Sequence, residues 1–346
     1  MRYIGGKSLL LNNIHSVIEK YTDKNINTVT DLFSGSGVVG VDMKDKGYGV
    51  VSNDLLYFSY VIARGNIGIN KKLSFSRLKE SGINNVIEHL NNLKIEDTEF
   101  NIKDCFIYQN YSPTDSCSRM YFQNSNALKI DIIRLQLKEW REKELLSNDE
   151  YFYLLASLLL AVPYVANITG TFGAYLKYWD KRTFNKLELK EHEIKIGKDC
   201  QCLWGDYTKA LEIKTDLLYA DPPYNSREYL PNYHVMETIA RYDYPMIKGV
   251  TGIREYSSEK SVFCKKASVV SAFDTLLKNA KSKYIIISYN NEGLISTEEL
   301  SSLCKKYAKL NTFHLVECDY RRYKNKIPNN KAGLKEQLYF LEKINE

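Results

Sequence analysis

The feature that most constrains the fold is a glycine-rich turn between a short apolar segment and a helical one. Residues 28–33 are β-branched and apolar, which favours a strand, and the turn Ser34-Gly35-Ser36-Gly37-Val38-Val39-Gly40 follows at once. A second short strand is expected at 48–52 and ends at Asn53-Asp54. Strand, turn, helix and strand make the start of a βαβ unit, so we expect an α/β fold with a parallel, doubly wound sheet.

The turn also predicts a ligand. Its glycines have the spacing Gly35-x-Gly37-x-x-Gly40, and Asp54 lies 19 residues after the first of them. Glycines let the backbone approach a ligand, and a carboxylate at the end of the second strand accepts hydrogen bonds from ribose hydroxyls. The pattern therefore indicates an adenosine-bearing cofactor more than NAD in particular. A turn that only permits tight packing is the alternative.

A second motif, Asp221-Pro222-Pro223-Tyr224, follows the apolar segment 216–220, which is expected to be a strand. The prolines hold an extended turn, so the Asp221 carboxylate and the neighbouring carbonyls can direct acceptors at one small target. With the ring of Tyr224 beside them, these acceptors suit a planar heterocycle that carries an amino group. Ordinary turn chemistry is the alternative.

The order of the predicted elements suggests one interrupted domain. Residues 56–202 are mostly helical in pattern, with an apolar helix at 150–162, and we interpret them as an insertion. Strand signals return at 216–220 and 283–288, the latter after a helix at 268–280. Two more strands, 312–318 and 337–341, flank a Lys/Arg-rich loop at 319–335. The predicted domains are therefore 1–55 with 203–346, and the inserted region 56–202.

Charge and composition narrow the class of protein. Residues 300–346 hold ten Lys/Arg and five Asp/Glu, a balance of +5 out of a net +6, which indicates a polyanionic partner or a solvated face. The seven cysteines have no zinc-site spacing and are expected to be reduced thiols. The apolar runs are too short for a membrane span, and the amino terminus does not resemble a secretory signal, so we expect a cytoplasmic protein with no membrane partner.

Taken together, the motifs resemble the amino-methylating DNA methyltransferases, and within them the adenine-specific DPPY group in its alpha arrangement, which includes DNA adenine methylase. The resemblance rests on Tyr3-Ile4-Gly5-Gly6-Lys7, Asp31-Leu32-Phe33-Ser34-Gly35-Ser36-Gly37 and Asp221-Pro222-Pro223-Tyr224, in that order. It extends into 225–229, 288–290 and 335–339. It implies a Rossmann-like S-adenosylmethionine-dependent methyltransferase sheet with a mostly helical inserted target-recognition domain.

The resemblance also implies roles for residues. The residues that would contact S-adenosylmethionine are Tyr3, Lys7, Phe33, Gly35, Gly37, Asp54 at the ribose, Asp206 at the adenine amino group, and Asp221. The catalytic residues would be Asp221, Pro222 and Tyr224, with Asp221 between cofactor and target base. For Asp206 a surface turn, for Lys7 a helix start and for Tyr224 core packing are the alternatives.

Duplex DNA is the implied partner, together with a cognate restriction endonuclease that acts on the same site. Arg321, Arg322, Lys324 and Lys326, with Lys331, are expected to contact phosphates. Base reading is expected from the insertion, where Ser118, Arg119 and Gln123 are suitable in type, as are many others. The glycine-punctuated segment 167–177 is a candidate for a loop ordered by DNA, or else a plain interdomain turn.

Other functions compete with N6-adenine methylation. Methylation of cytosine N4 or of RNA adenine uses similar pockets, although Asp before Pro-Pro favours adenine by resemblance. A nicotinamide-dependent oxidoreductase would explain the glycine turn but gives Asp221-Pro222-Pro223-Tyr224 no role. A non-catalytic nucleic-acid-binding module would explain the basic loop alone. Methylation of a cytosine ring carbon needs a cysteine nucleophile, and the chain has no Pro-Cys pair.

Overall fold

The structure is a computed structural model that describes residues 4–23, 25–319 and 335–344. Its residue contacts divide the chain into two compact units. The sheet unit comprises Gly5–Leu55, Gly197–Tyr229 and Ser258–Glu346, and the helical unit comprises Met1–Ile4, Leu56–Ile196 and Leu230–Ser257. Each unit is described by itself below.

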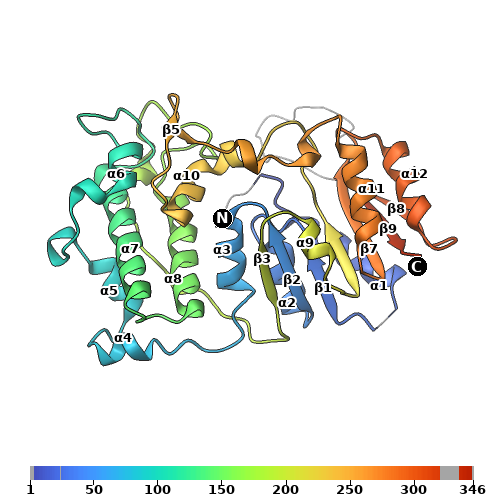
Figure 1. Cartoon of the computed structure of the whole chain (residues 1–346), viewed down its shortest axis with the longest axis horizontal. Helices are drawn as coiled ribbons and strands as arrows, with labels where there is room; N and C mark the ends of the chain where they lie inside the picture. The colour runs from blue at the N-terminus through green and yellow to red at the C-terminus, as the bar shows by residue number, and fades with distance from the viewer. Residues whose placement is uncertain (1–3, 24, 320–334, 345–346) are drawn as a thin grey trace. The chain divides into compact units, whose positions relative to one another are not determined.

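One mostly parallel sheet forms the centre of the sheet unit (Figure 1). The order of its strands is β3-β2-β1-β4-β7-β9-β8. Neighbours are parallel except at β9, which runs antiparallel to both β7 and β8. The strands are β1 (Thr28–Asp31), β2 (Gly49–Asp54), β3 (Gln201–Trp204), β4 (Leu217–Ala220), β7 (Tyr284–Asn290), β8 (His314–Asp319) and β9 (Lys335–Glu342).

Helices cover this sheet because its strands are apolar on both faces, as the fully buried β4 shows. One face, with Leu218 and Ile285, shares a hydrophobic cluster with residues of α9, α11 and α12. Helix α1 contacts β9, and its side chains Ile14, Val17 and Ile18 are buried. The helices of this unit are α1 (Leu11–Tyr21), α2 (Val38–Asp45), α9 (Thr208–Leu211), α11 (Val269–Asn279) and α12 (Thr297–Tyr307).

The strand order has a reversal point between β1 and β4. From β1 the chain proceeds outward to β2 and β3, and it then returns to place β4 on the other side of β1. In open parallel sheets, ligands bind at the carboxyl ends of the strands that flank such a point. The glycine turn follows β1 and Asp221 follows β4, so both predicted motifs lie at this edge.

The helical unit is built around α8 (Asn148–Ala161), which contacts α3 (Tyr57–Asn66) and α7 (Asn124–Glu142) (Figure 1). Ser147 and Glu150 form a capping box that begins α8. The other elements are α4 (Ser76–Glu80), α5 (Val86–Asn92), α6 (Phe106–Tyr111), α10 (Leu230–Arg241), β5 (Ile247–Lys248) and β6 (Ile253–Arg254). Short 3-10 turns along the chain are Ile95–Asp97, Ile102–Asp104, Val162–Tyr164, Lys181–Phe184, Ser257–Glu259 and Val262–Cys264.

The close contact of α3 with α8 depends on Gly65. A side chain at this position would collide with the Cβ of Ala156 and would come within 3.2 Å of the Phe152 carbonyl oxygen. Glycine is therefore needed here for close approach rather than for its backbone angles. Over the described residues, no helix is both long enough and apolar enough to cross a membrane.

Most of the predicted elements are present. The strands expected at 28–33, 48–52, 216–220, 283–288, 312–318 and 337–341 correspond to β1, β2, β4, β7, β8 and β9. The helices expected at 150–162 and 268–280 correspond to α8 and α11. Strand β3, which begins at Gln201 within the segment assigned to the insertion, was not predicted.

The division of the chain also differs from the predicted 56–202 insertion. The helical unit ends at Ile196 and takes in Leu230–Ser257, which follow Asp221-Pro222-Pro223-Tyr224 in the sequence. A buried carboxylate explains why: both oxygens of Glu237 on α10 accept hydrogen bonds from the first amides of α3, Tyr57 N at 2.9 Å and Phe58 N at 2.8 Å. A carboxylate that satisfies these amide donors fixes α10 to the start of α3.

Candidate active site

The turn after β1 is shaped by two glycines with left-handed backbone angles. Gly35 has φ of 50° and Gly37, which caps α2, has φ of 74°. Glycine adopts such angles without steric cost. The Gly35 amide donates to Oδ2 of Asp54 at 2.7 Å, and this bond joins the turn to the end of β2. The structure thus brings together Gly35 and Asp54, two of the residues implied to bind the cofactor.

Buried polar atoms surround this turn. Ser34 Oγ and Asn53 Oδ1 are buried and make no hydrogen bond within the described residues, whereas the Asn53 amide nitrogen donates to Leu32 O at 3.2 Å. Buried polar atoms without partners are uncommon, because each loses its bonds to water. Their presence beside Gly35 is what a site for a polar ligand requires.

The second motif ends in a buried cluster of charges. Lys7 donates to Oδ1 of Asp221 at 3.1 Å and also to Oε1 of Glu336, the second residue of β9. The Lys7 and Glu336 side chains are each 4% exposed and that of Asp221 is 19% exposed. The Ser288 hydroxyl on β7 donates to the same Oε1 of Glu336 at 2.8 Å.

This burial shifts the titration of the cluster. Burial opposes the charge on Lys7, but the charges of Asp221 and Glu336 outweigh it, so the pKa of Lys7 is raised. Burial raises the pKa of Asp221 to about 7; Lys7 opposes this rise and Glu336 adds to it. The Asp221 carboxylate therefore depends on Lys7 to remain ionised near neutral pH.

Another acid lies on the same face of the sheet. In the strand register Asp31 pairs with Tyr219, whose side chain points to the same face as that of Asp221 two residues later. The Asp31 carboxylate accepts from the Gly40 amide at 3.1 Å. Burial, together with the charges of Asp221 and Asp54, raises the pKa of Asp31 to about 7, although the Gly40 bond opposes this rise. The edge is thus strongly acidic, with Lys7 as a cation within it.

Tyr224 is in the hydrophobic core. Its side chain is 8% exposed and belongs to the cluster that includes Phe263, Phe273 and Tyr289. Its carbonyl oxygen accepts from Leu294 N at 3.1 Å. Pro222 is buried as well. The ring is therefore placed as core packing would place it, and its stacking on a base stays a prediction.

Phe33 packs against Tyr207, the residue that follows Asp206 in the chain. The rings of Phe33 and Tyr207 have centroids 5.9 Å apart, and Phe263 lies 5.2 Å from each. Asp206 is exposed, and its Oδ1 accepts from Thr208 N at 3.0 Å and from the Thr208 hydroxyl at 2.6 Å. These bonds form a local turn before α9. They do not test the implied contact of Asp206 with the cofactor.

Some predicted residues lie outside the described part of the chain: Tyr3, Arg321, Arg322, Lys324, Lys326 and Lys331. Glu336 and Ser288 were missed as site residues. Their segments belonged to the resemblance, but no spacing in the sequence relates Glu336 or Ser288 to Lys7. A charged residue next to a strand that is buried on both faces is the signal that could have found Glu336.

In the helical unit, Arg119 stabilises backbone. Its guanidinium donates to the carbonyl oxygens of Asn110 at 3.1 Å, Gly249 at 3.0 Å and Val250 at 3.0 Å. It thereby joins the loop after α6 to the β5–β6 hairpin. These bonds to backbone carbonyls are those of a structural role, and base reading by Arg119 stays a prediction.

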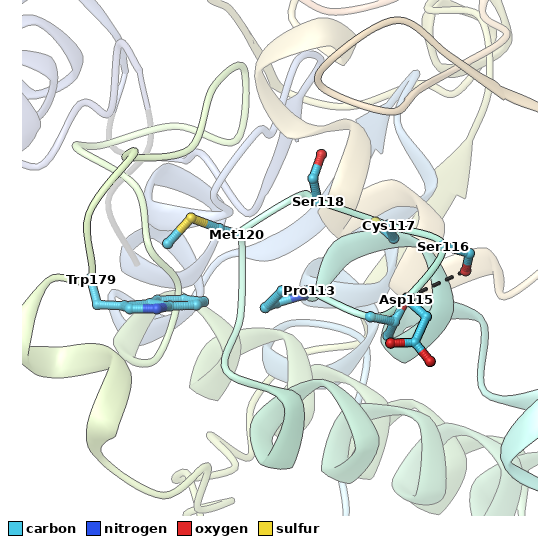
Figure 2. Close-up of a pocket in the computed structure, with 8 residues that line it drawn as sticks. Pro113, Asp115, Ser116, Cys117, Ser118, Met120 and Trp179 are labelled. Atoms are coloured by element: carbon cyan, nitrogen blue, oxygen red, sulfur yellow. Dashed lines mark hydrogen bonds between the residues drawn. The ribbon is translucent and has the colours of Figure 1, made fainter.

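A hollow of about 480 Å³ lies beside that loop, between residues 113–120 and Trp179. Figure 2 shows the Trp179 ring beside Met120, with Asp115 and Ser116 at the opposite end. Ser118, one of the residues suitable for base reading, also lines it. The hollow therefore combines an aromatic surface with exposed polar groups.

The segment 167–177 is held by hydrogen bonds within the helical unit. Buried Asn167 donates from its side chain to Leu176 O at 2.9 Å, and its Oδ1 accepts from Asp180 N at 3.1 Å. The Phe172 carbonyl accepts from the hydroxyl of Tyr121 at 2.9 Å. These bonds give the loop a defined conformation; ordering of this loop by DNA stays a prediction.

The fold, a mixed α/β unit with a mostly parallel central sheet, fits a methyltransferase. A family model of the D12 class N6 adenine-specific DNA methyltransferases matches residues 3–303. The chain belongs to this family. The predicted resemblance is thereby confirmed, and the oxidoreductase and non-catalytic alternatives are not supported.

Individual relatives agree with this membership. The chain is 42% identical to the Type II methyltransferase M.FokI of Planomicrobium okeanokoites over 99% of its length, which is 53% of that protein. It is 39% identical to the modification methylase StsI of Streptococcus sanguinis over 99% of its length and 52% of that protein. With the Type II methyltransferase M.NlaIII of Neisseria lactamica, identity is 36% over 99% of both chains. The chain thus spans about half the length of the first two relatives and nearly all of the third.

Proposed function

We propose that this chain transfers a methyl group from S-adenosylmethionine to the N6 amino group of adenine at a specific site in duplex DNA, as part of a restriction-modification system. The observation that carries the proposal is the Asp221 carboxylate, held by Lys7 at the end of β4, at the same sheet edge as the glycine turn of β1. The family and the names of the Type II relatives support the reaction and the substrate.

The residues around the turn fit S-adenosylmethionine. Asp54 would hold the ribose, since its carboxylate lies at the end of β2 beside the turn and can accept hydrogen bonds from hydroxyls. Ser34 Oγ and Asn53 Oδ1 offer polar atoms that lack partners in the described residues. Phe33 and Asp206 would bound the adenine end, and Tyr3 remains an expected contact. The bound cofactor supplies a methyl group already activated by its sulfonium.

Asp221 and the Pro222 carbonyl would act on the target amine. The lone pair of adenine N6 is delocalised into the ring, and hydrogen bonds from its two N–H groups to these acceptors shift the nitrogen towards a tetrahedral form. The methyl group would come from the sulfonium of the bound cofactor, whose sulfur would leave as a neutral thioether, and the nitrogen would lose one proton to Asp221 or to water. The reaction needs alignment and electrostatics more than a strong base.

Access to N6 requires the base to leave the duplex, because the amine is otherwise paired. We retain Tyr224 as a stacking candidate, although its ring packs in the core in this structure. A role for Arg321, Arg322, Lys324 and Lys326 on phosphates stays part of the proposal.

For the helical unit we propose target recognition, with the predicted 56–202 insertion extended by Leu230–Ser257. The hollow beside Trp179 is its best candidate for contact with bases, because an aromatic surface and nearby hydroxyl and carboxylate groups can read base edges. A cognate endonuclease and a cytoplasmic location also belong to the proposal.

The test is methyl transfer by the purified chain. Tritiated S-adenosylmethionine is offered with duplex DNA of mixed sequence, and with RNA in parallel, and the modified base is identified by mass spectrometry. We expect N6-methyladenine in DNA. Methylation of RNA alone, N4-methylcytosine, or no transfer to DNA would each contradict the proposal.

A matched pair of variants tests the site itself. Asp221→Ala removes the acceptor, and Asp274→Ala removes an aspartate on the exposed face of α11 that pairs with Lys306. We expect the first to lose methylation by a factor of about a thousand or more while remaining folded, and the second to keep it. Full activity of Asp221→Ala would refute the assignment.

A further inference from the structure

Glu336 has no assigned role, although its place in the structure is specific. It is buried on β9, and its Oε1 receives both the Lys7 ammonium and the Ser288 hydroxyl. The partner Asn290 lies opposite it in the register and is buried too. A buried carboxylate is costly unless it is paired, and this one is paired with the cation that also binds Asp221.

We propose that Glu336 is a positioning residue for the methyl transfer: with Ser288 it anchors Lys7, so that Lys7 holds the Asp221 carboxylate through Oδ1 and leaves Oδ2 directed to the substrate amine. This inference rests on the proposed function of the chain.

The geometry supports these roles, in which Glu336 anchors Lys7 and Lys7 holds Asp221. A lysine side chain is long and flexible, so a single ionic contact would leave the ammonium free to move along the carboxylate. Lys7 is instead held between two carboxylates on different strands, β9 and the end of β4. The ionic contact of Asp221 is made through Oδ1. Fixing the ammonium therefore fixes the orientation of the carboxylate that must align with the amine.

Ser288 orients the carboxylate of Glu336. Its hydroxyl reaches Oε1 from β7, the strand between β4 and β9 in the sheet order. The carboxylate of Glu336 is thus oriented by a neighbouring strand, as metal-binding and catalytic groups are often oriented by a second layer of hydrogen bonds.

The negative charge of Glu336 has a second consequence, which concerns the pKa values of Asp221 and Lys7. The titratable groups that face Asp221 are Lys7 from the chain before α1, Asp31 from β1, Tyr219 from β4 and Glu336 from β9. Glu336 raises the pKa of Asp221 and also that of Lys7. Removal of its charge should lower both pKa values, so the acid limb and the alkaline limb of the rate profile should both move to lower pH.

The main experiment compares Glu336→Gln with the wild type in the full chain. The variant keeps the size of the side chain and removes its charge. We expect kcat to fall on the order of tenfold, with the KM for DNA within about twofold and the acid limb of kcat lower by roughly one pH unit. Glu342→Gln, the same change at the far end of β9, should leave kcat, the KM for DNA and the acid limb unchanged.

Ser288→Ala separates orientation from charge. It removes the hydroxyl and keeps all three charges, so we expect a smaller fall in kcat with both limbs unmoved. It also provides a test if Glu336→Gln does not fold. A wild-type kcat in Ser288→Ala, or a shift of its acid limb equal to that of Glu336→Gln, would overturn the proposal.

The protonation of Lys7 can be followed directly, without turnover, by chemical labelling of its amine. Acetic anhydride modifies neutral amines, and its reaction with Lys7 can be measured by mass spectrometry against the exposed Lys46 of the same chain. At about pH 8.5 we expect the labelling of Lys7 in Glu336→Gln to rise about tenfold for each unit by which its pKa falls.

Two further results would overturn the inference: unchanged labelling of Lys7 in folded Glu336→Gln, or an unchanged pH profile of that variant. Failure of the proposed function is distinct, because the wild type would then transfer no methyl group to DNA while the labelling result would still report on Lys7.

Discussion

Removal of the Asp54 carboxylate should separate cofactor affinity from catalytic rate. Asp54 Oδ2 accepts the Gly35 amide at 2.7 Å, and the proposed ribose contact is made by the same carboxylate. Asp54→Ala therefore removes one observed bond within the turn and the proposed bonds to the ribose hydroxyls.

The expected loss of cofactor affinity in Asp54→Ala follows from the number of hydrogen bonds that the variant removes. Hydrogen bonds to charged groups contribute about 1.5–3 kcal/mol each, and the freed hydroxyls regain water. A net loss of about 2–3 kcal/mol corresponds to a 30- to 150-fold rise in the Kd for S-adenosylmethionine. The observed Gly35 bond alone predicts a loss of about 1–2 kcal/mol in the free energy of unfolding of the sheet unit.

The assay is isothermal titration of S-adenosylmethionine into the wild type, Asp54→Ala and Asp54→Asn. The asparagine variant can still accept the Gly35 amide, so it should keep the stability of the turn and lose only part of the cofactor affinity. Asp45→Asn at the exposed end of α2 serves as the control.

Ribose binding is equal in the ground state and in the transition state, so kcat at saturating cofactor should change little. A Kd within about threefold of the wild type in folded Asp54→Ala would refute the placement of the cofactor at this turn. A large fall in kcat with unchanged Kd would assign Asp54 to the chemistry instead.

Two further outcomes test the helical unit. Gly65→Val should destabilise this unit by about 1–3 kcal/mol, because the new side chain would collide with Ala156, and the urea midpoint of unfolding should fall. Gly170→Ala is the control and should be neutral, since a Cβ there meets nothing within 4 Å. Equal midpoints for the two variants would contradict the packing argument. Trp179→Ala should weaken DNA binding by about tenfold in a filter-binding assay and leave the Kd for S-adenosylmethionine unchanged. Trp204→Ala on β3 is the control. Undiminished DNA affinity in Trp179→Ala would remove the hollow from the proposal.

The elements that could be predicted from the sequence are those with a strong local pattern. Strands β4 and β7 are continuous apolar runs, and the glycine turn sits between a strand and a helix, so their order alone located the ligand-binding edge. Strand β3 is an edge strand with two exposed residues in four and has no such pattern. Its assignment needed the pairing with β2.

The parts of the site that could not be predicted depend on distant contacts. Lys7 and Glu336 are 329 residues apart, and no spacing rule relates them. Similarly, Arg119 is suited by type to bases, yet its donors bond backbone carbonyls more than 100 residues away. Tyr224 follows Pro-Pro at a strand end, which favours exposure to a ligand, but the aromatic cluster under β4 and β7 buries it.

The position of β9 between β7 and β8 makes the surroundings of Lys7 depend on a strand that follows both signature motifs in the chain. Lys7 gains its second carboxylate partner only when residue 336 has been added, after Asp221-Pro222-Pro223-Tyr224 is already made. A chain that stops before β9 has the glycine turn and Asp221-Pro222-Pro223-Tyr224, yet it lacks the strand that anchors Lys7. Incomplete translation products should therefore carry both signature motifs without the arrangement that orients Asp221.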